Sequence, residues 1–426
     1  MLRMLLSPLA AVLCFAQPVA QPGGHWAGAL QIQGQELKIL VDLDPGSPWQ
    51  GRISIPAQLL KDFPLAEVQV ASGSVAFRMA GIPGDPTFQG RLEDGQIRGT
   101  FRQGGQAFPF YLERAAREAS PALAAPAGVV EKDLAFGAAP FVLPGTLTLP
   151  AGKGPWPAVV LVHGSGPQDR NESLGPNAPF RDLAWGLAKR GIVVYRYDKR
   201  TKVAPQAFQA AYQDHMTVQE ETVLDAAAAA AILRGQPPVD PGKVFILGHS
   251  QGGTLLPRIG ARAPFAAGFI ALAGATRPME DLILEQVQYL QVPAATQADL
   301  KARVARVKAL VPGTPASGPL PFEVPASYWL DLRGYQPGLE AVKLGKPFLI
   351  LQGGRDYQVT AADFAGWKQA FQGKPGATFQ WFPSLNHLFM TGTGPASPKD
   401  YAVAGQVDEA VLEAIAGWVR VTGGRP

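Results

Sequence analysis

Polar and hydrophobic residues alternate in short segments along the first quarter of the chain. Turn sequences such as Asp44-Pro45-Gly46 separate these segments. A period of two sends successive side chains to opposite faces of a sheet, and Gly, Pro and Asp commonly end strands. Clear examples cover residues 37–43, 51–55, 74–78 and 96–101. We therefore predict a small antiparallel β domain over residues 21–114, folded as a sandwich or a barrel.

After an Ala- and Pro-rich segment at 115–129, which we interpret as a linker, the pattern changes. Strongly apolar segments now alternate with amphipathic ones, which is typical of a mostly parallel sheet flanked by helices. The predicted strands cover 157–162, 191–197, 243–247, 267–272, 347–351 and 377–382, and the predicted helices cover 180–190, 217–234, 252–263, 361–371 and 407–421. Residues 130–426 are thus predicted to form an α/β domain.

One insertion interrupts this alternation. About seventy residues separate the strand that ends near Leu272 from the strand that begins at Pro347. They contain amphipathic helical stretches at 280–290 and 297–310. Because loops of this length without secondary structure are uncommon in compact domains, we predict a helical cap at about 276–340.

Composition narrows the class of protein. The 426 residues are 47% hydrophobic and 17% charged, which provides for a large core. The 38 basic and 34 acidic residues give a net charge of only +4, and no Lys/Arg cluster stands out. Nucleic-acid binding is therefore not predicted. A mean hydropathy near zero argues against a polytopic membrane protein.

The first twenty residues have the features of a signal peptide. Arg3 precedes an apolar run at 4–16, and small residues follow up to Ala20. The run is too short for a stable membrane span, so we expect export, to the periplasm or the medium, with cleavage after Ala16 or Ala20. The one cysteine, Cys14, would be removed with it. The mature chain would then lack disulfides, a cysteine nucleophile and thiolate metal ligands.

The sequence Gly248-His249-Ser250-Gln251-Gly252 lies between an apolar strand and a helix. In this context a sharp turn strains the serine backbone and projects its hydroxyl above the sheet. Gly248 and Gly252 are expected because side chains there would collide within the turn. The motif therefore predicts Ser250 as a nucleophile.

A serine hydroxyl needs a general base, and the base needs a partner that orients it. Of the five histidines, only His387 lies beyond the final predicted strand. Asp356 follows the preceding predicted strand, whereas Asp363 is expected near a helix start. The chain order Ser250, Asp356, His387 is the order found when a strand–turn–helix serine carries the nucleophile.

The tetrahedral intermediate of acyl transfer carries a negative oxygen, which backbone N–H groups can stabilise. One expected donor is the N–H of Gln251, the residue after the nucleophile. The other is the N–H of Ser165, in the loop His163-Gly164-Ser165-Gly166 that follows the first strong strand. An alternative interpretation is that these glycines only end the strand.

With these residues identified, the chain from about residue 131 onward resembles the α/β-hydrolase superfamily. More narrowly, it resembles exported bacterial two-domain carboxylesterases with a β-rich N-terminal domain. The similar segments are 163–172, 197–200, 248–253 and 326–331. The resemblance implies a serine esterase that hydrolyses short-acyl, small-molecule esters without a metal or organic cofactor. It implies nothing about the role of the N-terminal domain, and the oligomeric state is not predicted.

Two other functions are compatible with parts of the pattern. A serine peptidase of the prolyl-oligopeptidase type uses the same three residues, but roughly ninety β-rich residues are too few for its repeated β-propeller. The second alternative is a non-catalytic protein that binds glycan or lipid on its β domain. The presence of every expected catalytic group argues against it.

Some side chains near the expected site allow two interpretations. The charged segments 169–172 and 198–200 either contact polar groups of the substrate or form structural ion pairs. The aromatic residues Tyr289, Tyr328 and Trp329 either line an acyl pocket or pack within the cap.

Overall fold

The computed structural model describes residues 22–32, 34–56, 60–80, 82, 84–116 and 123–424. The predicted signal peptide, with Cys14, lies outside these residues. The described part of the chain forms two compact units that divide between residues 116 and 123, and the described residues 55–56, 60–62 and 82 group with the second unit. No helix in the described ranges combines the length and apolar character needed to cross a membrane.

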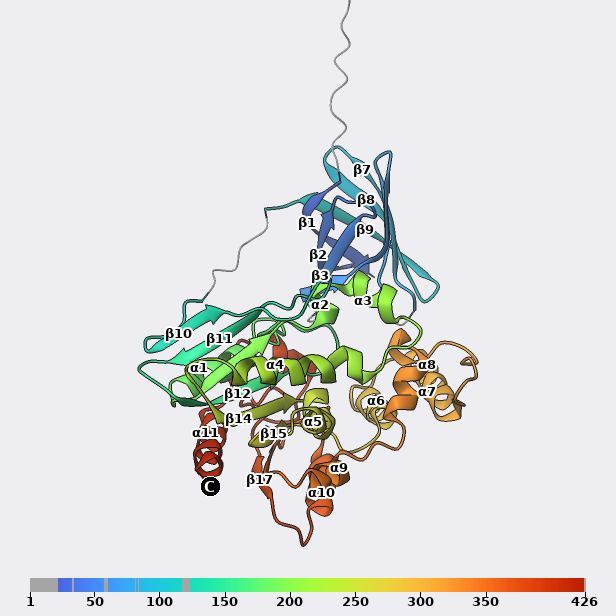
Figure 1. Cartoon of the computed structure of the whole chain (residues 1–426). Helices are drawn as coiled ribbons and strands as arrows, with labels where there is room; N and C mark the ends of the chain where they lie inside the picture. The colour runs from blue at the N-terminus through green and yellow to red at the C-terminus, as the bar shows by residue number, and fades with distance from the viewer. Residues whose placement is uncertain are drawn as a thin grey trace, which may run out of the picture. The chain divides into compact units, whose positions relative to one another are not determined.

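The first unit is a β unit made of one nine-stranded sheet, which curls in a barrel-like way (Figure 1). Its strands follow the order β4-β3-β2-β1-β9-β8-β7-β6-β5. Their bounds are β1 Gly24–Ile32, β2 Gln35–Asp44, β3 Gln50–Ile55, β4 Leu60–Pro64, β5 Ala66–Ala71, β6 Ser74–Arg78, β7 Thr87–Glu93, β8 Gln96–Gln103 and β9 Gln106–Arg114. A single curled sheet replaces the two-sheet sandwich that the sequence also allowed.

Alternation along these strands builds the core of the β unit. Ile39, Val41 and Leu43 of β2 are fully buried, and the residues between them are partly exposed. Phe88 on β7 packs against neighbouring rings, with centroids 4.6 Å from Phe77. Burying an aromatic or aliphatic side chain of this size contributes about 1.5–3 kcal/mol.

The second unit contains an eight-stranded mixed sheet and confirms the predicted α/β-hydrolase fold class. The strand order is β10-β11-β13-β12-β14-β15-β16-β17. The strands are β10 Val129–Asp133, β11 Gly145–Pro150, β12 Trp156–Val162, β13 Val193–Tyr197, β14 Val239–His249, β15 Gly268–Leu272, β16 Phe348–Gly353 and β17 Ala377–Phe382. From β13 to β17 all neighbours are parallel, so the carboxyl ends of these strands lie at one edge.

The antiparallel strands β10 and β11 were not predicted. β10 has the sequence VVEKD, is mostly exposed, and begins at Val129, the last residue of the predicted linker. Strand β10 lies at the edge of the sheet, buries little apolar surface, and therefore leaves a weak hydrophobic signal. Strand β11 is an interior strand and is buried, but its sequence, GTLTLP, is short and contains only two large apolar residues.

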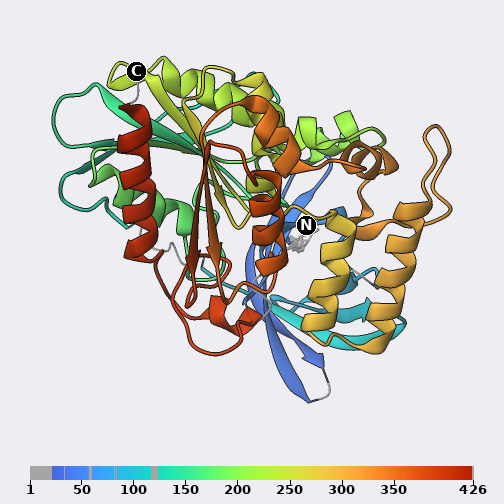
Figure 2. The same cartoon turned by 90° about the horizontal axis from the view of Figure 1, so that it is seen from below.

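Helices cover both faces of this sheet. Helices α1 (Pro179–Ala188) and α11 (Glu409–Gly423, red in Figure 2) pack on one face. Helices α4 (Leu224–Arg234), α5 (Gln251–Arg262) and α10 (Ala361–Ala370) pack on the other. The short helices α2 (Arg200–Val203) and α3 (Pro205–Tyr212) follow β13. Strand β12 contributes to the hydrophobic core on each face of the sheet. Val159 packs on the side of α1 and α11, and Val160 packs on the side of α4, α5 and α10.

Two helix starts depend on particular residues. The segment predicted as one helix over 217–234 begins with a π-helical turn, η2 (Gln219–Val223), before α4. Helix α10 begins with a capping box between Thr360 and Asp363, so the expected place of Asp363 near a helix start is confirmed.

The insertion between β15 and β16 is helical. It comprises α6 (Met279–Tyr289), α7 (Ala294–Ala309), the 3₁₀ turn η3 (Pro321–Glu323), α8 (Ala326–Leu332) and α9 (Pro337–Leu344). Helices α6 and α7 lie side by side (Figure 2). They share a small core with Trp329 of α8, which includes Ile283, Leu300, Val304 and Val307.

Candidate active site

Ser250 occupies a tight turn between β14 and α5. Its φ of 52° and ψ of −119° lie outside the ordinary regions for an L-residue, a conformation that costs about 1–3 kcal/mol. A Cβ at Gly248 would lie 2.3 Å from the carbonyl of Gly252, and a Cβ at Gly252 would lie 2.4 Å from the carbonyl oxygen of Val162. Both positions therefore require glycine, and the turn sets the half-buried Ser250 at the carboxyl edge of the sheet.

Asp356 and His387 meet at the neighbouring strand ends. Strands β16 and β17 are parallel partners, so the loops that follow them lie side by side. A Cβ at Gly353 would lie 2.5 Å from the carbonyl oxygen of Leu385, which shows how closely these loops approach. The Nδ1 of His387 lies 2.7 Å from Oδ2 of Asp356, and both residues are buried.

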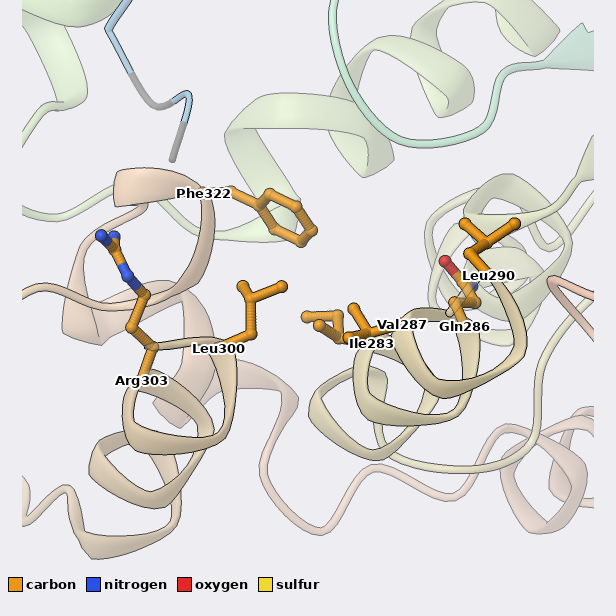
Figure 3. Close-up of a pocket in the computed structure, with 7 residues that line it drawn as sticks. All are labelled: Ile283, Gln286, Val287, Leu290, Leu300, Arg303 and Phe322. Atoms are coloured by element: carbon orange, nitrogen blue, oxygen red, sulfur yellow. The ribbon is translucent and has the colours of Figure 1, made fainter. Parts of the chain in front are cut away.

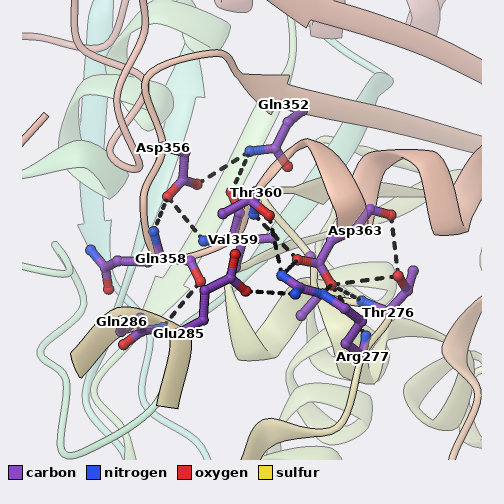
Figure 4. Close-up of polar contacts among 12 residues, drawn as sticks. Thr276, Arg277, Glu285, Gln286, Gln352, Asp356, Gln358, Val359, Thr360 and Asp363 are labelled. Carbon is purple, nitrogen blue, oxygen red and sulfur yellow. Dashed lines mark hydrogen bonds and ion pairs between the residues drawn. The ribbon is translucent and has the colours of Figure 1, made fainter. Parts of the chain in front are cut away.

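Three further hydrogen bonds hold the Asp356 carboxylate (Figure 4). Its Oδ1 accepts from the N–H of Gln358 at 2.8 Å and of Val359 at 3.0 Å. Its Oδ2 accepts from the Gln352 amide at 3.3 Å. An ionised carboxylate only accepts hydrogen bonds, so Nδ1 of His387 carries the proton in this pair. That tautomer leaves Nε2 of a neutral His387 free to act as a base.

The imidazole of His387 lies against the residue that precedes the nucleophile. Its ring centroid is 4.6 Å from that of His249, and its backbone carbonyl is 2.9 Å from Nε2 of His249. Within the described residues, the Ser250 hydroxyl forms no hydrogen bond with His387. Such contacts often tighten only when substrate is bound.

The loop after β12 lies beside Ser250 because β12 and β14 are adjacent. A Cβ at Gly164 would lie 3.2 Å from the Cβ of Ser250. The next residue, Ser165, is exposed, and among the described residues nothing accepts a hydrogen bond from its N–H. Gln251 is the first residue of α5, and its N–H has no acceptor within the helix. Both expected oxyanion donors thus have unpaired N–H groups.

A buried ion pair joins this loop to His249. Oε1 of Glu172 accepts from the N–H of Gly164 at 2.7 Å, and Oε2 lies 2.8 Å from Nδ1 of His249. Burial alone would lower the pKa of His249, but the Glu172 carboxylate and the His387 carbonyl raise it above its ordinary value. Burial would raise the pKa of Glu172, yet the charge of His249 lowers it. Nδ1 of His249 faces the Glu172 carboxylate and Nε2 faces the His387 carbonyl, an arrangement that favours the protonated ring.

The charged segments singled out from the sequence form ion pairs with each other and with neighbouring residues of the second unit. Arg170 contacts Asp198 at 2.8 Å, and Lys199 contacts Glu221 at 3.0 Å. Arg200 pairs with Asp225 of α4. In the protein without substrate, these segments therefore form structural ion pairs, which is one of the two interpretations that the sequence allowed. These partners could not be matched from the sequence, and neither could the contact between Glu172 and His249.

The other histidines are engaged elsewhere. His163 is buried between the rings of Phe180 and Tyr197, with centroids 5.1 and 5.2 Å away. Burial lowers its pKa to about 4. His25 pairs with Asp42 in the β unit, and His215 is exposed.

A cavity of about 170 Å³ lies in the insertion, between α6 and α7 (Figure 3). Its lining is mostly apolar and comprises Ile283, Gln286, Val287, Leu290, Leu300, Arg303 and Phe322. None of the three aromatic residues proposed for an acyl pocket lines it. Tyr289 stacks on Tyr357 with centroids 4.9 Å apart, and Trp329 packs in the core of the insertion.

Helix α6 of the insertion is tied to the loop that follows Asp356 (Figure 4). The amide of Gln286 donates to the carbonyl of Gln358 at 3.1 Å. Arg277 bridges Glu285 of α6, at 2.5 Å, and Asp363 of α10, at 2.7 Å. The insertion therefore contacts the segment that follows Asp356, the residue expected to orient His387.

This fold and these strand-end residues define an α/β hydrolase, and the chain belongs to the alpha/beta hydrolase family, whose sequence model matches residues 159–404. A curated relative is Esterase EstD of Thermotoga maritima, 38% identical over 301 residues, which are 69% of this chain and 68% of that protein.

Two solved structures are similar to this chain at low sequence identity. Est1E from Butyrivibrio proteoclasticus is 14% identical with a TM-score of 0.45, over 69% of this chain and 99% of that one. The esterase domain of a Rhodothermus marinus protein is 17% identical with a TM-score of 0.42, over 69% of this chain and all of that one.

Proposed function

We propose that this protein is a serine carboxylesterase that hydrolyses small-molecule esters through an acyl-enzyme intermediate. Ser250 is the nucleophile, His387 the general base and Asp356 the residue that orients it. The observation that carries the proposal is the 2.7 Å contact between His387 and Asp356 beside the strained turn of Ser250. The 38% identity to an esterase supports the choice of ester substrates.

In the first half-reaction, Oγ of Ser250 attacks the ester carbonyl carbon while Nε2 of His387 takes its proton. The carbonyl oxygen becomes an oxyanion, which the N–H groups of Ser165 and Gln251 stabilise. The intermediate collapses, the bond to the alcohol oxygen breaks, and His387 returns the proton to the leaving alcohol. The product is an ester of Ser250.

The second half-reaction repeats these steps with water. His387 takes a proton from water, the resulting nucleophile attacks the acyl-enzyme, and a second oxyanion forms. Its collapse breaks the bond between the acyl carbon and Oγ of Ser250, His387 returns the proton to Oγ, and the carboxylic acid is released. Asp356 remains ionised throughout and stabilises the imidazolium in both halves.

The test compares the wild type with Ser250→Ala on 4-nitrophenyl acetate and butyrate. The proposal predicts a fall in kcat of at least about 10⁴-fold, because the nucleophile and its base act as a unit. The matched control is Ser74→Ala, an exposed serine of the β unit, whose activity should equal that of the wild type. Unchanged ester hydrolysis by Ser250→Ala would refute the proposal.

Substrate class and location are tested separately. A panel of acyl lengths should show highest activity on short chains, and a sharp optimum at long chains would contradict that part. Cleavage of aminoacyl amides without cleavage of simple esters would favour a peptidase.

The sequence at residues 1–20 supports export. We therefore predict that mass spectrometry of the protein from the periplasm or medium finds a mature N-terminus after Ala16 or Ala20.

A further inference from the structure

A buried chain of polar side chains connects the two proposed oxyanion donors. It begins at Lys199, which follows β13 and whose side chain is 2% exposed. Nζ of Lys199 donates to the carbonyl oxygen of Gly164 at 3.0 Å and to Oε1 of Glu221 at 3.0 Å. The lysine therefore contacts the backbone next to Ser250 without reaching solvent.

The chain continues from Glu221 to the residue after the nucleophile. Glu221 lies on the π-helical turn η2, and its Oε2 accepts from the hydroxyl of Tyr328 at 2.8 Å. The same hydroxyl accepts from the side-chain amide of Gln251. Burial, and then the charge of Glu221, raise the pKa of Tyr328 well above its ordinary value, so the phenol stays protonated. Tyr328 belongs to α8, which brings the insertion into this network.

The contact between Lys199 and Gly164 fixes the direction of a neighbouring N–H. The carbonyl of Gly164 and the N–H of Ser165 belong to one peptide group. A trans peptide is planar, and its C=O and N–H point in opposite directions. An ammonium that holds this C=O therefore turns the N–H of Ser165 away from Lys199. A hydrogen bond to a charged group also polarises the peptide and makes its N–H a stronger donor.

Gly164 needs such restraint because glycine has the widest choice of backbone conformations. Its N–H is held by Glu172 at 2.7 Å and its C=O by Lys199 at 3.0 Å. Removal of Lys199 would free the Gly164–Ser165 peptide to rotate. Stability alone does not require the ion pair with Glu221, because well-packed apolar replacements for such pairs are often neutral or stabilising.

We infer that Lys199 is a positioning residue for ester hydrolysis, which holds the Gly164–Ser165 peptide so that the Ser165 N–H faces the oxyanion formed at Ser250. Glu221 and Tyr328 hold Lys199 in place and connect the same anchor to Gln251. The inference rests on the proposed function of Ser250. It assigns to a buried lysine a role that acts only in the transition state.

The experiment measures kcat, KM and inhibitor affinity for Lys199→Met and for the double variant Lys199→Met/Glu221→Gln, which leaves neither charge unpaired. Loss of one oxyanion donor costs about 10²–10³ in kcat, so its misorientation should cost about 10–100-fold. KM should change less than about twofold, because the interaction is absent from the ground state.

A transition-state analogue separates this role from a structural one. Ser250 adds to a trifluoromethyl ketone, its proton passes to His387, and the ketone oxygen becomes an oxyanion. Affinity for this ketone should fall by the same factor as kcat/KM in both variants, whereas affinity for the unactivated methyl ketone should not change. Lys343→Met, at an exposed lysine of α9 paired with Glu340, is the control and should match the wild type.

Wild-type kcat and ketone affinity in either Lys199 variant would overturn the inference, as would a loss confined to KM. If neither variant folds, Tyr328→Phe decides, since it removes only the hydroxyl that links Glu221 to Gln251. It should lower kcat and ketone affinity together by a few-fold, and no change would overturn the inference. Activity that survives Ser250→Ala would instead refute the proposed function, so the two failures are distinguishable.

Discussion

In the β unit, ion pairs such as Arg78–Glu67 lie at the surface, whereas the second unit buries several charged side chains. Among the described residues, every fully buried charged or polar side chain belongs to the second unit. They include Glu172 and Lys199, which contact Gly164, and Asp356, which contacts His387. Burying a charge is costly unless it is paired and hydrogen-bonded. The β unit therefore has an apolar core, whereas the second unit holds paired charges in its interior, several of them near the strand ends that carry Ser250, Asp356 and His387.

The largest expected effect comes from Asp356→Asn, compared with Asp42→Asn in the β unit. Each change neutralises a carboxylate that pairs with a histidine. At Asp356 the amide favours the wrong tautomer of His387, so kcat on 4-nitrophenyl butyrate should fall about 10⁴-fold. Asp42→Asn should leave kcat unchanged. Equal kcat values for the two variants would contradict the claim that only the Asp356–His387 pair takes part in catalysis.

An intermediate effect is expected on stability from Glu172→Gln, compared with Glu67→Gln. Glu172→Gln removes the buried carboxylate that pairs with His249, which should lower the free energy of unfolding by about 3–5 kcal/mol. Glu67 is 65% exposed in its pair with Arg78, so Glu67→Gln should change it by less than about 1 kcal/mol. Urea unfolding of both variants measures the difference, and similar losses would contradict the contrast.

The smallest predicted effect concerns acid stability and His163. Its pKa of about 4 in the folded protein lies below the ordinary 6.5. The unfolded chain therefore binds more protons between these values, and the folded state loses stability as pH falls through 6.5 towards 4. The loss amounts to about 3 kcal/mol. His163→Phe keeps a ring between Phe180 and Tyr197 and should flatten this part of the curve, measured by urea unfolding from pH 7 to 4.5. An unchanged slope in His163→Phe would show that other groups cause it.

The sequence predicted the strands and helices with strong periodicity, together with the turn at Ser250. Asp356 and His387 could be identified because the fold fixes which strand ends carry them, and the structure brings these two residues into contact. Strand β10 is mostly exposed and left a weak apolar signal, and β11, although buried, is short and alternates leucine with threonine. The short turn η2 was merged into one predicted helix.

The pairing of buried charges could not be predicted. Glu172 and His249 are far apart in sequence, as are Lys199 and Glu221, and their meeting depends on how loops pack over the sheet. Charged residues in a loop give the same sequence pattern whether they face solvent or a buried partner. Tyr328 was noted only as an aromatic residue, while its hydroxyl proved to be the part that matters for the network.

The most direct measurement of the central claim is detection of the acyl-enzyme. The wild type is mixed rapidly with 4-nitrophenyl acetate, the release of nitrophenol is followed, and the quenched protein is digested and analysed by mass spectrometry. We predict an acetyl group on the peptide that contains Ser250, formed before steady turnover and absent from Ser250→Ala. Steady ester hydrolysis with no acylation of Ser250, or with the acetyl group on another residue, would contradict the account.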